Sequence, residues 1–285
     1  MSYVKVVDLL KNADQQKTAV IAFICIDYNM VASVIRAAEE QKKPAIIMLL
    51  PEHVSLNKMP GFEEFAAMVK EMAQKASIPV ALHLDHSFDE EEVYRAIDAG
   101  FSSVMFDASR DDLEENIRRT KAVVDYAHAR SVSVEAELGS VGLAIDRADK
   151  NTDFYTKPST VKVYCESTGV DSLAIAIGNA HGDYPLPPKL DLNRLDEINA
   201  ITDVPLVLHG GSGIPEDQLT EAFARGINKF NYGTDLLRCY QDAIRRYFTE
   251  HAPSAALDII GLPEYVQDEM VKLVMHKLTL EKYRL

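Results

Sequence analysis

The sequence predicts an α/β protein that forms a closed (β/α)8 barrel. Short apolar segments alternate with longer amphipathic segments, and the alternation repeats about eight times along the 285 residues. Histidines and carboxylates follow several of the apolar segments at their C-terminal ends. An open doubly wound sheet is the alternative, but it more often carries a glycine-rich turn after its first strand, and F-I-C-I-D-Y has none. We therefore expect a single barrel domain over residues 1–285.

The predicted strands are short and mostly apolar, which is typical of strands buried on both faces, as in a TIM barrel. The segments A-I-I-M-L-L and S-L-A-I-A-I show this composition. The strands are expected at residues 19–25, 45–50, 80–85, 103–107, 132–137, 172–178, 205–210 and 229–233.

The predicted helices have residues at their ends that commonly start or stop a helix. Gly100, Gly169 and Gly226 follow helices, where a left-handed residue caps the last turn. Asp89 and Pro215 suit helix starts. One helix is expected before the barrel at residues 4–12, and the others at 28–40, 61–76, 90–99, 113–129, 159–167, 192–200, 216–225 and 234–249.

Residues 257–285 remain after the eighth unit and predict a C-terminal helical extension. Met270, Val271, Val274 and Leu278 have the apolar spacing of a helix. We expect the extension to pack on the barrel or on a neighbouring subunit.

The composition excludes several classes of partner. The formal net charge is -14, which argues against nucleic acid and anionic membranes, since both bind basic surfaces. An anionic substrate would then need a metal ion, a helix N-terminus or a group of backbone N–H donors. The cysteines form no C-x-x-C pattern, the N-terminal segment lacks a signal-peptide core, and no apolar run reaches membrane-spanning length. These features predict a cytoplasmic protein.

Residues 80–88, V-A-L-H-L-D-H-S-F, place two histidines and an aspartate at the end of an apolar run. Strand alternation puts the valine and leucine side chains on one side and His83 and Asp85 on the other, with His86 at the following turn. This pattern favours a functional strand end in a barrel. Alternatively, His83 and Asp85 form a buried hydrogen-bonded pair that only supports the core.

His181 and His209 also follow predicted strands. Because polar residues at the C-terminal ends of barrel strands converge on one mouth, we expect both to meet His86 there, beside several carboxylates. Such a site fits one Zn²⁺ per chain with a position open for a substrate oxygen, and another divalent metal would also fit. The carboxylates would orient the imidazoles; they are Asp85, Asp107, Glu135 and Glu137.

The other five histidines are not predicted to be metal ligands. His53 is expected in a loop and His83 in the barrel interior. The remaining three, His128, His251 and His276, fall on helical segments and are expected at the surface.

Two glycine-containing segments predict a phosphate site. In residues 209–213, H-G-G-S-G, the backbone N–H groups of Gly210 and Gly211 can approach an anion closely, and Ser212 adds a hydroxyl. In residues 231–235, N-Y-G-T-D, Gly233 and Thr234 open the next helix and add further N–H groups. Loops after strands seven and eight often bind phosphate in this fold. The alternative is that the glycines make ordinary turns.

Five ordered motifs resemble one enzyme family. They are A-L-H-L-D-H, S-V-E-A-E-L-G, G-V-D-S-L-A-I-A-I-G-N-A-H-G-D-Y, P-L-V-L-H-G-G-S-G-I-P and I-N-K-F-N-Y-G-T-D-L. In this order they resemble the class II, zinc-dependent fructose-bisphosphate and tagatose-bisphosphate aldolases, and the similarity runs from about residue 18 to 248.

The resemblance implies roles for residues at the mouth. It implies that Asp85 exchanges a proton with the aldehyde oxygen and that zinc is bound by His86, His181 and His209, with Glu137 as an additional or alternative ligand. Asp107 and Glu135 would support the ligands. A monovalent cation near the phosphate is also expected. The substrate's phosphate and hydroxyl groups would be held by Gly182, Gly210, Ser212, Asn231 and Thr234.

The chain departs from the family pattern at positions that bear on the substrate. The family usually has a phosphate-contacting lysine shortly after the tyrosine of H-G-x-Y, but Pro185 and Leu186 follow Tyr184 here, and Lys189 is the nearest replacement. Ile145 occupies the place of a glutamate often assigned to proton transfer. The tail also lacks an obvious match for the arginine that binds the second phosphate.

The sequence therefore predicts a zinc-dependent aldolase that reversibly cleaves a ketose mono- or bisphosphate, or a related polyhydroxy ketone. Its products would be dihydroxyacetone phosphate, or a similar ketone, and an aldehyde. One alternative is a metal-dependent epimerase or isomerase that uses the same enediolate stabilisation. Another is a non-catalytic metal-binding barrel, against which Asp85 argues. The resemblance also implies a homodimer or homotetramer, with residues 257–285 as the contact.

Overall fold

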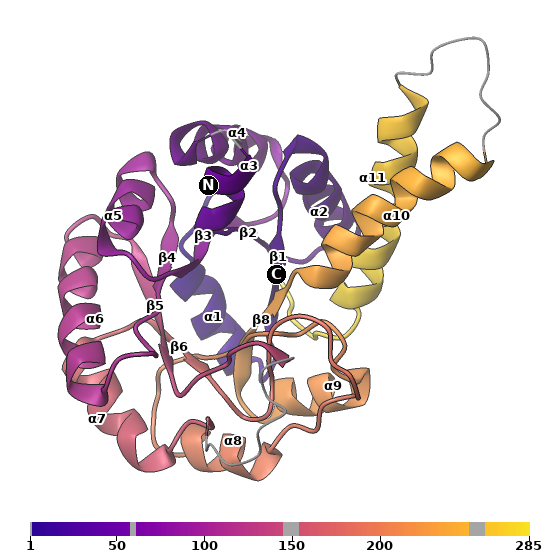
Figure 1. The fold of residues 1–285 in the computed structure, drawn as a ribbon. Helices are drawn as coiled ribbons and strands as arrows, with labels where there is room; N and C mark the ends of the chain where they lie inside the picture. The colour runs from indigo at the N-terminus through magenta and orange to yellow at the C-terminus, as the bar shows by residue number, and fades with distance from the viewer. Residues whose placement is uncertain (1, 58–60, 145–153, 251–259) are drawn as a thin grey trace.

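The computed structural model describes residues 2–57, 61–144, 154–250 and 260–285. Eight parallel strands pair in chain order and close on themselves, because the first strand also pairs with the eighth (Figure 1). This arrangement confirms the predicted (β/α)8 barrel. The strands are β1 Val20–Ile24, β2 Ala45–Leu49, β3 Val80–Ser87, β4 Ser103–Phe106, β5 Ser133–Leu138, β6 Ser172–Ile175, β7 Leu206–Leu208 and β8 Ile227–Tyr232.

Helices surround the barrel at the places predicted from sequence, with boundaries that differ by a few residues. The predicted left-handed caps are present at Gly100 and Gly169, with φ of 99° and 72°. The helices are α1 Val6–Gln15, α2 Tyr28–Gln41, α3 Pro51–Asn57, α4 Phe62–Lys75, α5 Glu90–Ala99, α6 Leu113–His128, α7 Pro158–Thr168, α8 Leu192–Asn199, α9 Glu216–Ala224, α10 Thr234–Glu250 and α11 Gly261–Leu278.

One described helix, α3, was not predicted. The segment was expected to be a loop that includes His53, but Pro51 occupies the first helical position, where its fixed φ suits a helix and its missing N–H has no consequence. This short helix brings His53 and Glu52 to the barrel mouth.

The strands divide their side chains between two environments. On β3, Val80, Leu82 and Leu84 belong to the large apolar core between the barrel and the helices, as alternation predicts. His83 and Asp85 face the other way and are also buried. At the N-terminal end of the barrel, α1 closes the interior by packing apolar side chains against inward-facing residues of β1, β2 and β3.

The C-terminal extension packs on the barrel helices through α11. Its buried residues include Met270, Val271, Val274 and Leu278, the four positions predicted to face the core. They pack against α2 and α10 at one side of the ring (Figure 1). Residues 257–259 lie outside the described part, and the predicted subunit contact stays a prediction. Among the described helices, none is long and apolar enough to cross a membrane.

A buried hydrogen-bond cluster joins α6 and α7 to the C-terminal end of β5. Asn116 donates through Nδ2 to the backbone oxygen of Glu137 at 3.2 Å. Its Oδ1 accepts hydrogen bonds from the hydroxyls of Tyr164, at 2.7 Å, and Thr120, at 3.0 Å. The cluster therefore fixes the strand end that carries Glu137.

We predict that Tyr164→Phe lowers the free energy of unfolding by about 1–3 kcal/mol, because the buried Asn116 oxygen loses a donor. Urea denaturation measures this change. Tyr126→Phe is the matched control: its hydroxyl bonds Asp98 at the surface, so the change should stay within about 0.5 kcal/mol. Equal losses in both variants would contradict a structural role for the cluster.

Candidate active site

A cavity of about 650 Å³ opens at the C-terminal end of the barrel. Most residues predicted to act in catalysis or binding line it. His209 and Glu135 lie behind its surface and are fully buried. The predicted residues that line the cavity are Asp85, His86, Asp107, Glu137, His181, Gly182, Gly210, Gly211, Ser212, Asn231, Gly233 and Thr234.

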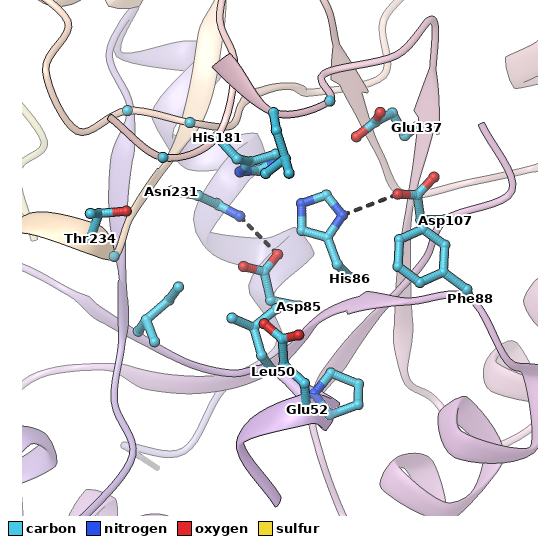
Figure 2. Close-up of a pocket in the computed structure, with 18 of the residues that line it drawn as sticks. Leu50, Glu52, Asp85, His86, Phe88, Asp107, Glu137, His181, Asn231 and Thr234 are labelled. Carbon is cyan, nitrogen blue, oxygen red and sulfur yellow. Dashed lines mark hydrogen bonds and ion pairs between the residues drawn. The ribbon is translucent and has the colours of Figure 1, made fainter. Parts of the chain in front are cut away.

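The end of β3 has an irregular backbone that directs two consecutive side chains into the cavity. Residues of a regular strand alternate between faces, so Asp85 and His86 would point in opposite directions. The β3–β4 register shifts between Leu84 and Ser87, and His86 has a φ of 29°. This left-handed conformation costs a non-glycine residue about 1–3 kcal/mol. In exchange, both side chains reach the site (Figure 2).

Three imidazoles meet at the mouth, as predicted. The ring centroid of His86 lies 4.6 Å from those of both His181 and His209, and the latter two lie 5.7 Å apart. Backbone hydrogen bonds from His181 to Gly142 and from Ala144 to His181, each 2.9 Å long, fix the loop after β6. The three rings can offer nitrogen atoms within 4.8 Å of one another, as a metal ion requires.

Carboxylates determine which nitrogen of two rings carries the proton. His86 Nδ1 lies 3.1 Å from Asp107 and His209 Nε2 lies 2.8 Å from Glu135, so each of these nitrogens donates a hydrogen bond. The remaining nitrogens, Nε2 of His86 and Nδ1 of His209, face each other at 2.8 Å. In neutral rings both would carry lone pairs, and these repel unless a cation or a proton lies at the same point.

Other unsatisfied atoms near the rings also fit a metal ion. Nε2 of His181 and Oε2 of Glu137 are buried and have no hydrogen-bond partner among the described residues. A second group that could hold a metal consists of His86, Asp107 and Glu137, and it shares His86 with the imidazole group. The donor atoms of the three imidazoles therefore suit a divalent ion, and Glu137 belongs to the neighbouring group that shares His86.

Burial and neighbouring charges determine the protonation of these groups. Burial lowers the pKa of His86, but the charge of Asp85 and the hydrogen bond to Asp107 outweigh it and raise the pKa to about 9. Burial and the charge of His86 lower the pKa of His181 to about 3. Burial and the charge of Asp107 raise the pKa of Glu137 to about 7. Without a metal ion, His86 is therefore protonated at neutral pH, and the proton on its Nε2 lies between that atom and Nδ1 of His209.

The carboxylate of Asp85 lies beside the imidazole cluster. Asn231 donates to its Oδ1 at 3.1 Å (Figure 2). His209 Nδ1 lies 3.9 Å from the same oxygen. Burial raises the pKa of Asp85, but the charge of His86 outweighs it and holds the pKa below its usual value. Asp85 is therefore ionised at neutral pH and can accept a proton from a bound molecule.

The opposite part of the mouth is shaped by glycines. A Cβ on Gly210, whose φ is 64°, would lie 2.0 Å from the oxygen of Ala180, and one on Gly211 would lie 2.1 Å from the ring of Phe230. Only glycine fits there. Ser212 lies in this loop, and its hydroxyl accepts the N–H of Asp235 in the first turn of α10 at 3.2 Å. Backbone N–H groups of this region can hold an anion.

Comparison with known proteins shows that residues 4–283 match the family described as fructose-bisphosphate aldolase class-II. The chain belongs to this family. The enzyme class predicted from the sequence, a metal-dependent carbon–carbon lyase, is confirmed. The sequence-based resemblance is confirmed with it.

Individual relatives of this class II aldolase are similar over most of their length. A fructose-bisphosphate aldolase of Geobacillus stearothermophilus is 41% identical over 247 residues, which are 86% of this chain and 85% of the relative. The YdjI aldolase from Escherichia coli K12, known from a crystal structure, is 34% identical to this chain with a TM-score of 0.86. The match covers 99% of this chain and 98% of that protein. The fructose-bisphosphate aldolase structure from Campylobacter jejuni shares the fold, with a TM-score of 0.83 at 21% identity. The match covers 98% of this chain and 95% of that protein.

Sequence reasoning missed several residues of the aldolase site. Lys229 is fully buried inside the barrel, and its Nζ lies 2.8 Å from Glu135 Oε2. His53 and Arg110 line the cavity. The lysine of I-N-K-F-N lies on the same face of its strand as Asn231, two residues later, so strand alternation could have placed it inside.

Two other predictions concern the substrate loops. Lys189, the expected replacement for the missing phosphate lysine, is absent from the residues that line the cavity. That assignment is therefore not supported by the geometry. Ile145 and His251 lie outside the described residues.

We predict that metal binding to the aldolase weakens as pH falls. A metal ion must displace the proton of His86, whose pKa is about 9, so apparent affinity should drop about tenfold per pH unit from pH 9 toward pH 7. Competition with a chromophoric chelator measures the affinity. Zinc addition to unbuffered metal-free protein at pH 7.5 should release about one proton per chain. An affinity independent of pH over this range would contradict the proposed proton exchange.

Proposed function

We propose that this aldolase uses zinc and cleaves a phosphorylated ketose to dihydroxyacetone phosphate and an aldehyde. The observation that carries the proposal is the alignment of the imidazoles: two ring nitrogens face each other at 2.8 Å beside an ionised carboxylate. The glycine-rich loop after β7 forms one side of the same cavity. The proposed positions of the metal, the base and the anion thus lie at one cavity.

Zinc is the metal that the ligand set favours. Imidazole is a borderline-soft donor, and a site of three histidines leaves a coordination position for substrate oxygen. We assign His86, His181 and His209 as the ligands and Glu137 as an alternative ligand. When bound, the ion supplies the positive charge that stabilises the enediolate left by carbon–carbon cleavage. No lysine Schiff base is then required.

Asp85 performs the proton transfer in the cleavage direction. Its ionised carboxylate accepts the proton of the hydroxyl on the carbon that becomes the aldehyde. The carbon–carbon bond next to the carbonyl then breaks, and its electron pair remains on the ketone fragment. In the condensation direction Asp85 returns the proton to the aldehyde oxygen. The hydrogen bond from Asn231 keeps the carboxylate oriented.

The phosphate is assigned to the loops after β7 and β8. Gly210, Gly211 and Ser212 offer donors from one loop, and Gly233 and Thr234 offer donors at the start of α10. A 17-residue helix concentrates positive potential at this end. Gly182 lies beside this region and has space above its Cα. We also propose a monovalent cation near the phosphate and a homodimer or homotetramer.

We predict that the protein contains about one zinc per chain and that His209→Ala loses it. The variant removes a nitrogen that faces the metal position and leaves Glu135 without its imidazole partner. Elemental analysis of chelator-free protein measures the content. His276→Gln is the matched control, since His276 lies at the surface and pairs with Glu216. Absence of metal from the wild type after zinc is supplied would reject the proposal.

We predict that Asp85→Asn lowers kcat for cleavage by about 10²- to 10⁴-fold, because the amide cannot accept the proton. Zinc content and unfolding temperature should stay close to wild type. A panel of ketose phosphates and free ketoses identifies the substrate, and mass analysis must show an aldehyde and a ketone. A single product of unchanged mass would indicate an isomerase instead. Asp98→Asn, on the exposed part of α5, should retain activity.

A further inference from the structure

The cavity wall contains one arginine among many acidic groups. Of the described residues that line the cavity, Arg110 is the only lysine or arginine. Five carboxylates line the same cavity: Glu52, Asp85, Glu92, Asp107 and Glu137. A substrate that carries negative charge at its aldehyde end would be repelled by this wall unless a cation faced it.

Arg110 is held in a defined position by an aromatic ring. Its guanidinium lies 4.3 Å from the ring centroid of Phe88, within the range of a cation–π contact. A guanidinium that stacks through its face keeps the N–H groups of its edge available for a planar anion. Within the described part of the chain, Arg110 makes no ion pair that would occupy those groups.

The segments that carry Arg110 and Phe88 are fixed to each other by a second arginine. Arg119 on α6 donates to the backbone oxygen of Phe88 at 3.2 Å and to Asp111 at 2.8 Å. Asp111 follows Arg110, and its N–H bonds the oxygen of Ala108 at 3.0 Å. The loop after β4 and the end of β3 are thus tied together, and the stacked pair is pre-organised.

The stacked pair lies across the mouth from the glycine-rich loops. In an eight-stranded barrel paired in chain order, β4 is opposite β8. Arg110 follows β4, whereas Gly233 and Thr234 follow β8. His86, the proposed ligand at the end of β3, bonds Asp107 through its Nδ1. Asp107 lies three residues before Arg110. An extended substrate with its phosphate at the glycines would direct its far end toward Arg110.

We propose that Arg110, presented by Phe88, binds a carboxylate or phosphate at the aldehyde end of the substrate. The proposal rests on the proposed aldolase function and narrows its substrate class to ketose phosphates with a second anionic group. Arg110 acts as a specificity residue: it binds the end of the substrate far from the bond that breaks.

Condensation with dihydroxyacetone phosphate tests the proposal with matched pairs of aldehydes. Glyceraldehyde 3-phosphate is compared with glyceraldehyde, and succinic semialdehyde with butanal. The zinc-loaded wild type should favour the anionic member of at least one pair in kcat/KM. Arg110→Gln should reduce that preference about 10- to 100-fold, which corresponds to the loss of a charge-assisted hydrogen-bonded pair. The pair affected identifies phosphate or carboxylate as the group bound.

Further variants separate a specific role of Arg110 from a general effect. Arg110→Lys should recover part of the preference, because the charge remains but the planar fork is lost. Phe88→Leu should weaken it by removing the support. Arg95→Gln is the matched control, because Arg95 also stacks on a phenylalanine, Phe62, at 5.4 Å but does not line the cavity. Equal aldehyde preference in wild type and Arg110→Gln would overturn the inference.

A half-reaction distinguishes failure of this inference from failure of the proposed function. Enzyme that forms the enediolate exchanges a C3 proton of dihydroxyacetone phosphate with D2O in the absence of any aldehyde. Exchange by the wild type, without selectivity between paired aldehydes, would reject the role of Arg110 and keep the aldolase. Absence of exchange in zinc-loaded protein would reject the aldolase proposal itself.

Discussion

The site depends on the opposition of two imidazole nitrogens. Asp107 accepts a hydrogen bond from His86, and Glu135 accepts one from His209. The unprotonated nitrogens of the two rings are therefore directed toward one point. A positive species is then required between them, since two lone pairs at 2.8 Å repel. The hydrogen bonds to Asp107 and Glu135, on the far sides of the two imidazole rings, thus favour a cation between them. Asp107 directly follows β4 and Glu135 lies on β5, and these two strands are adjacent in the barrel.

Beneath this centre lies a charged network inside the barrel. Glu135 contacts His209 with one oxygen and Lys229 with the other, and all three side chains are fully buried. The charge of Lys229 helps to hold the pKa of Glu135 well below its usual value, against the effect of burial. An ionised Glu135 can only accept hydrogen bonds, so it imposes one tautomer on His209. A buried ion pair gives little net stability, and its contribution here is orientation.

Much of the barrel and the mouth follows from local patterns in the sequence. Short apolar strands, glycine caps and histidines at strand ends predict the eight units and the residues that meet. The bulge at His86 has no such pattern, because it depends on how β3 pairs with β4. The role of Lys229 also escapes composition rules, which place lysine at the surface. Arg110 belongs to a loop, and its stacking on Phe88 follows from tertiary packing that spacing alone does not encode.

Helix α1 closes the N-terminal end of the barrel with Val6, Leu9, Leu10 and Ala13. A barrel sealed at that end exchanges molecules with solvent only through the opposite mouth. Substrate and both products must therefore use one passage. The closed floor therefore gives the two fragments of the cleaved substrate a single shared exit.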